Sequence, residues 1–190
     1  MNDKVHILGM AGSLRENSFN RALLHEATHL TPVDAEIEIF ELGGIPGFNQ
    51  DEENEPPQKI KDLKQKVEEA DAILFVTPEY NYSVSGVLKN AIDWASRPSG
   101  DNSFNGKPAA IMGASISLIG TARAQYHLRQ MCVFLNMYPV NMPEVMVANA
   151  TEKFDDEGNL NNDTAKDLMR QLLQNLVEWT RQLKAAQPTA

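Results

Sequence analysis

The sequence predicts a doubly wound α/β fold, because apolar runs of strand length alternate with amphipathic helical segments along the chain. Runs such as Ala72 to Val76 show no polar alternation, which indicates strands buried on both faces, as in a parallel sheet. A length of 190 residues and a hydrophobic content of 42% suit one domain with a full-sized core. We therefore expect a single domain over residues 1–190, with helices on both faces of its sheet.

Five apolar runs are predicted strands, over residues 4–10, 35–40, 72–77, 108–114 and 144–148, and the last is the weakest. Helical periodicity predicts helices over residues 18–30, 57–70, 85–96, 121–135 and 164–185, the last one capped by Asp163 or Thr164. Five parallel strands match the flavodoxin-like order 2-1-3-4-5, a three-layer sandwich. In such sheets the ligand binds beyond the carboxyl ends of the strands, beside strands 1 and 3.

The segment after the first predicted strand, Gly-Ser-Leu-Arg-Glu-Asn-Ser-Phe-Asn over residues 12–20, has the composition of a phosphate site. It leads into a helix, whose N-terminus attracts phosphate through unpaired N–H groups and its dipole. Ser13 and Ser18 add hydroxyl donors, and Asn20 adds an amide. Arg15 can bind two phosphate oxygens at once. The same residues would also suit a surface loop capped by Ser18, with Arg15 in solvent.

The segment after the third predicted strand suits a flat ring with polar edges. It reads Thr-Pro-Glu-Tyr-Asn-Tyr-Ser and begins where the strand ends. Pro78 fixes the chain direction, and the backbone N–H groups from Glu79 to Asn81 can face the polar edge of a ligand. Tyr80 and Tyr82 offer flat faces with polar tips. The alternative is a packed loop with two structural tyrosines, but the neighbouring phosphate loop favours a ligand.

A site for a phosphomonoester beside a site for a flat polar ring describes FMN. Together with these two segments, Leu-Lys-Asn-Ala-Ile-Asp-Trp at 88–94 and Arg-Ala-Gln-Tyr-His-Leu-Arg at 123–129 resemble the NADPH-dependent FMN reductase family. Within that family the likeness is to bacterial chromate and quinone reductases, and it extends from about residue 5 to residue 147. The resemblance implies FMN as cofactor and NADPH or NADH as electron donor.

The resemblance also assigns roles to particular residues. It implies that the FMN phosphate is held by Ser13, Arg15, Ser18, Phe19 and Asn20. It implies that the isoalloxazine is flanked, largely through main-chain groups, by Pro78, Glu79, Tyr80, Asn81 and Tyr82. Ser115 lies in a third loop that relatives place beside the ring. Here this chain carries Ala114 and Ile116 at positions that relatives often fill with Gly or Ser.

No side chain is expected to act as an acid, base or nucleophile, because a flavin performs hydride chemistry and the protein positions it. The resemblance implies ping-pong transfer from NAD(P)H to FMN and then to small acceptors, namely quinones, chromate, azo compounds, ferric complexes or free flavin. Two alternatives remain: a flavodoxin-like FMN electron carrier without NAD(P)H activity, and a flavin-free sensor of a phosphate ligand. Arg15 favours the reductase over the carrier, since flavodoxin phosphate loops are generally neutral.

A second group of residues is predicted to line the substrate entrance or a subunit contact. In relatives, an Arg–Tyr–Glu network bridges the subunits of a dimer or tetramer near the active site. Arg123, Tyr126 and Glu144 match it here, with Tyr82 close by, so a homodimer or homotetramer is implied. The alternative for Arg123 and Glu144 is an ordinary surface ion pair, worth under ~1 kcal/mol. Arg97, after the third predicted helix, is a further candidate for the entrance.

The composition argues against several classes of partner. The 17 basic and 26 acidic residues give a net charge of −9, whereas nucleic-acid binding needs a basic face. No apolar stretch approaches the ~20 residues of a membrane-spanning helix, so membrane insertion is not expected. The chain has a single cysteine, Cys132, which is expected to be buried in a helix. One cysteine cannot form an internal disulfide, and no apolar leader precedes the first strand, so a cytoplasmic protein is predicted. His25 and His29 are expected on a solvated helix face, and no metal site is predicted.

Overall fold

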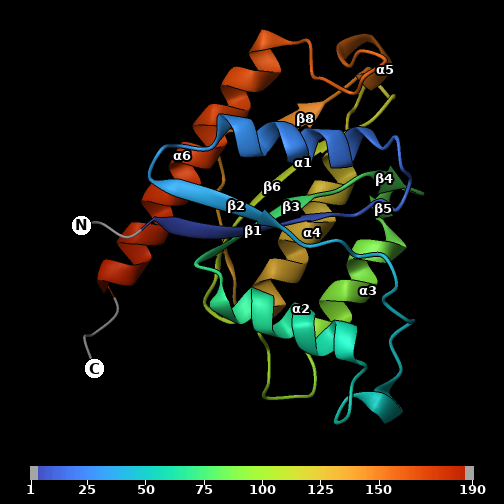
Figure 1. The fold of residues 1–190 in the computed structure, drawn as a ribbon, viewed down its shortest axis with the longest axis vertical. Helices are drawn as coiled ribbons and strands as arrows, with labels where there is room; N and C mark the ends of the chain where they lie inside the picture. The colour runs from blue at the N-terminus through green and yellow to red at the C-terminus, as the bar shows by residue number, and fades with distance from the viewer. Residues whose placement is uncertain (1–3, 187–190) are drawn as a thin grey trace.

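The computed structural model describes residues 4–186 and confirms the predicted α/β fold, a sheet between two layers of helices (Figure 1). The elements, in chain order, are β1 (Val5–Ala11), α1 (Phe19–Leu30), β2 (Ala35–Ile39), the 3-10 helix η1 (Gln50–Glu52), α2 (Gln58–Glu69), β3 (Ala72–Val76), β4 (Glu79–Tyr80), β5 (Ser83–Val84), α3 (Gly86–Ala95), β6 (Pro108–Ala114), α4 (Ala122–Phe134), β7 (Tyr138–Pro139), β8 (Val145–Val147), α5 (Ala150–Lys153) and α6 (Asp163–Ala186). Among these helices, none is both long enough and apolar enough to cross a membrane.

The main sheet is parallel and has the order β2-β1-β3-β6-β7, with β8 also paired to β6. This confirms the predicted order of the first four long strands. The expected fifth strand, over residues 144–148, is present as β8, and the two-residue strand β7, which was not predicted, brings the sheet to six strands: β7 pairs with the start of β6 and β8 with its end. Pro139 and Pro143 have no backbone N–H, so β7 and β8 cannot join into one unbroken strand.

The central strands β1, β3 and β6 are buried on both faces, which explains why they read as continuous apolar runs. In β1, Val5 and Ile7 belong to the core that the sheet forms with α1 and α6. Leu8 and Met10 of the same strand belong to the core formed with α2, α3 and α4. Figure 1 shows α1 and α6 on one side of the sheet and α2, α3 and α4 on the other. Parallel sheets need this double cover.

Two local predictions are corrected by side-chain contacts. Asn162 caps α6, since its Oδ1 accepts the N–H of Ala165 at 2.9 Å, so the expected caps Asp163 and Thr164 are wrong by one or two residues. The segment after β3, predicted as a loop, contains the two-stranded hairpin β4–β5. Strands of two residues are too short to leave a periodic signal in the sequence.

The long loop between β2 and α2 is fixed to α3. Asn90 Nδ2 and Trp94 Nε1 both donate to the carbonyl oxygen of Pro46, at 2.7 and 2.9 Å. Phe48 N donates to Asn90 Oδ1 at 2.7 Å, and the Phe48 ring meets the Trp94 ring edge-on. The Leu-Lys-Asn-Ala-Ile-Asp-Trp motif therefore has a structural role, which is to hold this loop beside the carboxyl end of the sheet.

Candidate functional site

The loops after β1, β3 and β6 meet at the carboxyl edge of the sheet, as predicted for the first two. Gly12 N donates to the carbonyl of Val76 at 2.9 Å, which ties the start of the first loop to the end of β3. A Cβ at Gly12 would lie 2.6 Å from Ser85 Oγ, so this approach requires glycine. Asn20, on α1, is hydrogen-bonded to Ala114 at the end of β6. Three loops from three neighbouring strands can thus border one ligand.

The first loop carries the hydroxyl groups that a phosphate requires. Ser18 caps α1, because its Oγ accepts the N–H groups of Asn20 and Arg21 at 3.2 and 3.5 Å. Ser13, also buried, accepts the N–H of Arg15 at 3.4 Å. Both hydroxyl oxygens act as acceptors in these contacts, so their O–H hydrogens are left to donate to a ligand. Two hydroxyl donors at a helix N-terminus fit a phosphate group.

Arg15 lies exposed at the rim of this loop. Its Nη2 donates to the carbonyl of Asn17, and its guanidinium carbon lies 5.6 Å from the ring centre of Phe19. The Phe19 ring packs in turn against Phe154 after α5, with ring centres 5.2 Å apart. Neither contact neutralises the positive charge, so the guanidinium can bind an anion.

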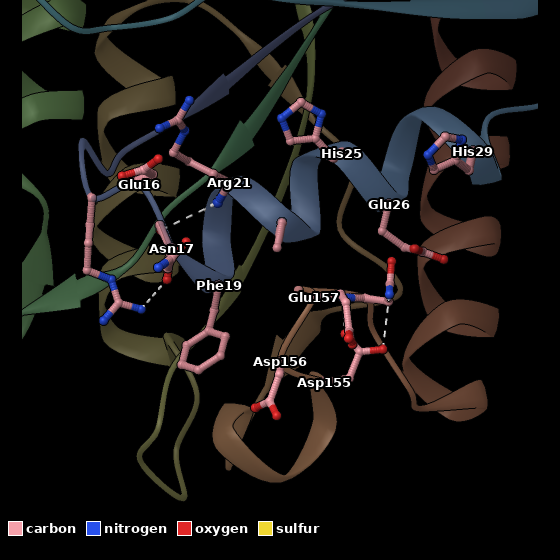
Figure 2. A pocket seen from close by; sticks show the side chains of 15 residues that line it. Glu16, Asn17, Phe19, Arg21, His25, Glu26, His29, Asp155, Asp156 and Glu157 are labelled. Atoms are coloured by element: carbon pink, nitrogen blue, oxygen red, sulfur yellow. Dashed lines mark hydrogen bonds between the residues drawn. The ribbon is translucent and has the colours of Figure 1, made fainter.

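A cavity of about 520 Å³ lies on the outer side of α1, between this helix and the turn after α5 (Figure 2). Its walls carry the carboxylates of Glu16, Glu26, Asp155, Asp156 and Glu157. Arg15, Ser18 and Phe19 of the first loop line one end of the same cavity, and the carboxylates elsewhere on its walls disfavour an anion there. His25 and His29 also line the cavity, from the exposed face of α1 where they were predicted. Within residues 4–186, no three metal-ligating side chains are grouped to hold an ion.

The second loop is a tight hairpin with an unusual turn. Asn81 and Tyr82 occupy its two central positions, with φ of 48° and 67°. Positive φ at both positions is the turn that best matches the twist of a two-residue hairpin. Asparagine tolerates this backbone, but a bulky residue such as tyrosine rarely adopts it. Tyr80 and Tyr82 are 56% and 69% exposed, so both rings are free to contact a ligand.

Glu79 and Arg123 are partners within one chain. The Glu79 side chain, only 6% exposed, pairs with Nε of Arg123. Its Oε2 also accepts the N–H groups of Arg123 and Ala124, at 3.0 and 3.3 Å. The guanidinium carbon of Arg123 lies 3.7 Å from the ring centre of Tyr82. The carboxylate of Glu79 thus faces α4, which leaves its main chain for the expected contact with a ring.

Tyr126 and Glu144 also meet within the chain. A hydrogen bond to the Glu144 carboxylate raises the pKa of the Tyr126 hydroxyl, because the bond and the negative charge both favour the protonated phenol. Tyr126 is 50% exposed on the outer face of α4. Of the expected Arg–Tyr–Glu group, Tyr126 and Glu144 are thus paired, whereas Arg123 pairs with Glu79.

The structure does not bring Arg97 to this group. α3 begins beside the hairpin, and its 10 residues carry the chain away from the carboxyl edge. Helical rise places its far end about 15 Å from its start. The carbonyl of Arg97 there accepts a hydrogen bond from Lys64 Nζ at 2.6 Å.

The third loop turns apolar side chains outward. Ser115 N donates to the Val147 carbonyl at 2.9 Å, and the Ser115 and Ser117 hydroxyls bond to one another and to the Gly120 carbonyl. Three large apolar side chains of the loop, Ile116, Leu118 and Ile119, are 69%, 83% and 52% exposed. Because the polar groups bond internally, the rim beside Ser115 is apolar.

One contact in the site was not predicted from the sequence. Ser83 Oγ lies 3.0 Å from His127 Nδ1, which joins β5 to α4. The two residues are separated by 44 positions and belong to two different motifs, the segment that ends at Ser83 and the motif at 123–129. No sequence signal could have paired them. Cys132, by contrast, is buried in α4 as predicted, at 1% exposure.

Comparisons with known proteins find flavin-dependent reductases that are similar to this chain over most of its length. The family model for NADPH-dependent FMN reductase matches residues 5–152. The chain is 51% identical over 185 residues to an NAD(P)H-dependent FMN reductase of Pseudomonas aeruginosa, covering 97% of this chain and 100% of that one. It is 40% identical over 172 residues to a 2-hydroxy-1,4-benzoquinone reductase of a Burkholderia species, covering 90% and 94%. Among solved structures, the flavoenzyme NAD(P)H:(acceptor) oxidoreductase FerB of Paracoccus denitrificans superposes with a TM-score of 0.86 at 34% identity, covering 94% of this chain and 98% of FerB.

Proposed function

Because the chain belongs to the NADPH-dependent FMN reductase family, we propose that its first loop holds the FMN phosphate and its β4–β5 hairpin holds the isoalloxazine ring. The protein is an NAD(P)H-dependent FMN/quinone oxidoreductase, with FMN as cofactor and NAD(P)H as electron donor. The observation that carries the site assignment is the contact of three loops at the carboxyl edge, with Asn20 of α1 bonded to Ala114 of β6.

The residues of the first loop contribute to phosphate binding in different ways. Ser13 and Ser18 donate hydroxyl hydrogens, and Arg15 supplies the full positive charge. The N-terminal dipole of α1 adds a further partial charge. Phe19 and Asn20 shape the loop from behind, since one stacks on Phe154 and the other bonds to β6. The phosphate therefore anchors the cofactor through charge and oriented donors.

The hairpin and the third loop hold the ring. When bound, FMN supplies the hydride chemistry. Pro78 sets the direction of the chain out of β3, and main-chain N–H groups from Glu79 to Tyr82 stabilise negative charge at the edge of the ring. Tyr80 contributes an exposed aromatic face, and Ser115 borders the ring from the third loop. No side chain is assigned a proton transfer.

We propose that NAD(P)H and the acceptor occupy the same open face in turn, which is a ping-pong order. Quinones are the acceptors that the exposed apolar rim of Ile116, Leu118 and Ile119 best supports, because a neutral ring gains from apolar contact. The Burkholderia relative is named for a benzoquinone substrate. Chromate, azo compounds, ferric complexes and free flavin are further candidate acceptors.

The protein is proposed to act as a homodimer or homotetramer in the cytoplasm. α4 and the segment after it expose Val133, Phe134 and Met142 at 82%, 77% and 66%, close to Tyr126 and Glu144 in the sequence. Large exposed apolar side chains in one region favour a subunit contact. The single cysteine supports a reducing compartment.

Steady-state kinetics test the proposed order. NADPH and a benzoquinone are varied together, and initial rates are plotted as reciprocals. Parallel lines are expected for ping-pong, and intersecting lines would contradict a shared face.

Anaerobic addition of NADPH or NADH to the FMN-loaded protein should bleach the ~450 nm flavin band, and the faster donor is the preferred one. Chromate and an azo dye, assayed in the same way, rank the acceptors.

A further inference from the structure

Glu79 caps the helix that covers the hairpin. Thr121, at the N-cap position of α4, makes no capping hydrogen bond with its side chain. Glu79 supplies this cap from another segment, since its Oε2 accepts the N–H groups of Arg123 and Ala124. A carboxylate at a helix N-terminus also interacts favourably with the helix dipole. The start of the hairpin is thereby fixed to the start of α4.

Arg123 extends this connection to the turn. Its Nε pairs with the other carboxylate oxygen of Glu79, and its planar guanidinium stacks 3.7 Å from the ring centre of Tyr82. Tyr82 is the residue held at a φ of 67°. A bulky residue keeps a left-handed backbone only where its surroundings hold it there. Arg123, bound to Glu79 on one side and stacked on Tyr82 on the other, is that restraint.

We propose that Glu79 and Arg123 are positioning residues for the flavin ring: together they hold the Asn81–Tyr82 turn in the backbone conformation that presents its main-chain groups to the ring. The proposal rests on the assignment of the hairpin to the isoalloxazine. It gives Arg123 a role in the site of its own chain, separate from any subunit contact.

The test compares two flavins on the full-length chain freed of cofactor. Dissociation constants for FMN and for riboflavin, which lacks the phosphate, are measured by flavin fluorescence. Arg123→Lys keeps the charge but removes the flat stacking surface. It should weaken both flavins by a similar factor, about fivefold to tenfold, because only the ring site is disturbed. Arg129→Lys, the same substitution on the same helix, is the control, since Arg129 bonds to the Val140 carbonyl and not to the hairpin.

A second pair of variants separates restraint from direct contact. Glycine adopts positive φ without strain, so in a Tyr82→Gly background there is neither a ring to stack nor a strained turn to hold. Arg123→Lys should then have no further effect on either dissociation constant. Additive losses in the double variant would overturn the proposal. Glu79→Gln, which keeps an acceptor for α4 but loses the charge, serves in the same cycle should Arg123→Lys fold poorly.

The remaining outcomes distinguish this proposal from the site assignment itself. Unchanged affinities in Arg123→Lys with weakened binding in Tyr82→Gly would reject the positioning role but keep the ring on the hairpin. Unchanged affinities in both variants would reject the positioning role, because a turn that binds equally well without the stacking and without the tyrosine needs no restraint. A loss of oligomer mass in Arg123→Lys without a change in flavin affinity would assign Arg123 to subunit contact alone and overturn the proposal.

Discussion

Asn20 and Ala114 are joined by two reciprocal hydrogen bonds, 94 residues apart in the sequence. Asn20 Nδ2 donates to the Ala114 carbonyl at 2.9 Å, and the Ala114 N–H donates to Asn20 Oδ1 at 2.8 Å. Both residues are buried. The pair fixes the first turn of α1, which follows the loop proposed to hold the phosphate, against the end of the strand that leads to the third loop.

Asn20→Ala should therefore destabilise the protein and loosen the site together. The substitution removes both hydrogen bonds and leaves the buried N–H and C=O of Ala114 without partners, a loss of roughly 3 kcal/mol in the free energy of unfolding. Urea unfolding of the cofactor-free chain measures it. Asn17→Ala, an exposed amide in the same loop, is the control and should change the free energy by less than about 0.5 kcal/mol. Equal stability of the two variants would contradict the role given to Asn20.

Arg15→Ala should weaken FMN binding about thirtyfold, or about 2 kcal/mol, through loss of a charge-assisted contact to the phosphate. Riboflavin affinity should not change, because riboflavin has no phosphate. Fluorescence titration with both flavins gives the comparison. Arg21→Ala is the matched control, since Arg21 is engaged with Glu41 at 2.9 Å. An FMN dissociation constant equal to that of the unmodified chain would remove Arg15 from the phosphate site.

Cys132 should be unreactive in the folded protein at neutral pH. Burial raises the pKa of its thiol from 9.0 to about 11, because the apolar surroundings disfavour the thiolate. A raised folded-state pKa stabilises the fold fully below pH 9.0, and this contribution is lost as the pH rises towards about 11. Mass spectrometry after iodoacetamide treatment should find no label on the native chain and one label after unfolding in urea. Rapid labelling of the native chain would show that this part of α4 opens.

Glu144→Ala should shift the protein towards smaller assemblies. The substitution removes the carboxylate that bonds to Tyr126 on the exposed face of α4. Light scattering over a dilution series reports the mass, with Glu152→Ala, an exposed acid outside this face, as control. A mass that stays equal to the control at every dilution would argue against a subunit contact here.

Much of the fold could be predicted because its signals are local. The buried strands β1, β3 and β6 are continuous apolar runs, and the helices between them carry regular apolar stripes. The short strand β7 could not be predicted, because two residues leave no periodic signal and its pairing partner, the start of β6, lies far away in the sequence.

The candidate site also has some features that local sequence signals predict and others that they do not. Ser18 was identifiable as a helix cap from its place before an apolar periodic segment, and its hydroxyl does cap α1. The direction of the Glu79 side chain was not identifiable, because its partners on α4 lie 44 and 45 residues further along. The left-handed backbone of Tyr82 was not identifiable either, since the sequence signal for such a turn is glycine or asparagine and not tyrosine.

The sequence by itself determined the order of strands and helices, the hydroxyl-rich loop with its one arginine, and the family to which these motifs belong. These properties follow from residue type and from spacing along one segment. Only the tertiary structure decided that Glu79 faces α4, that Arg123 stacks on Tyr82, and that α3 carries Arg97 away from the site. Each of these is a contact or a separation between segments, set by how the helices pack on the sheet, and no local pattern records it.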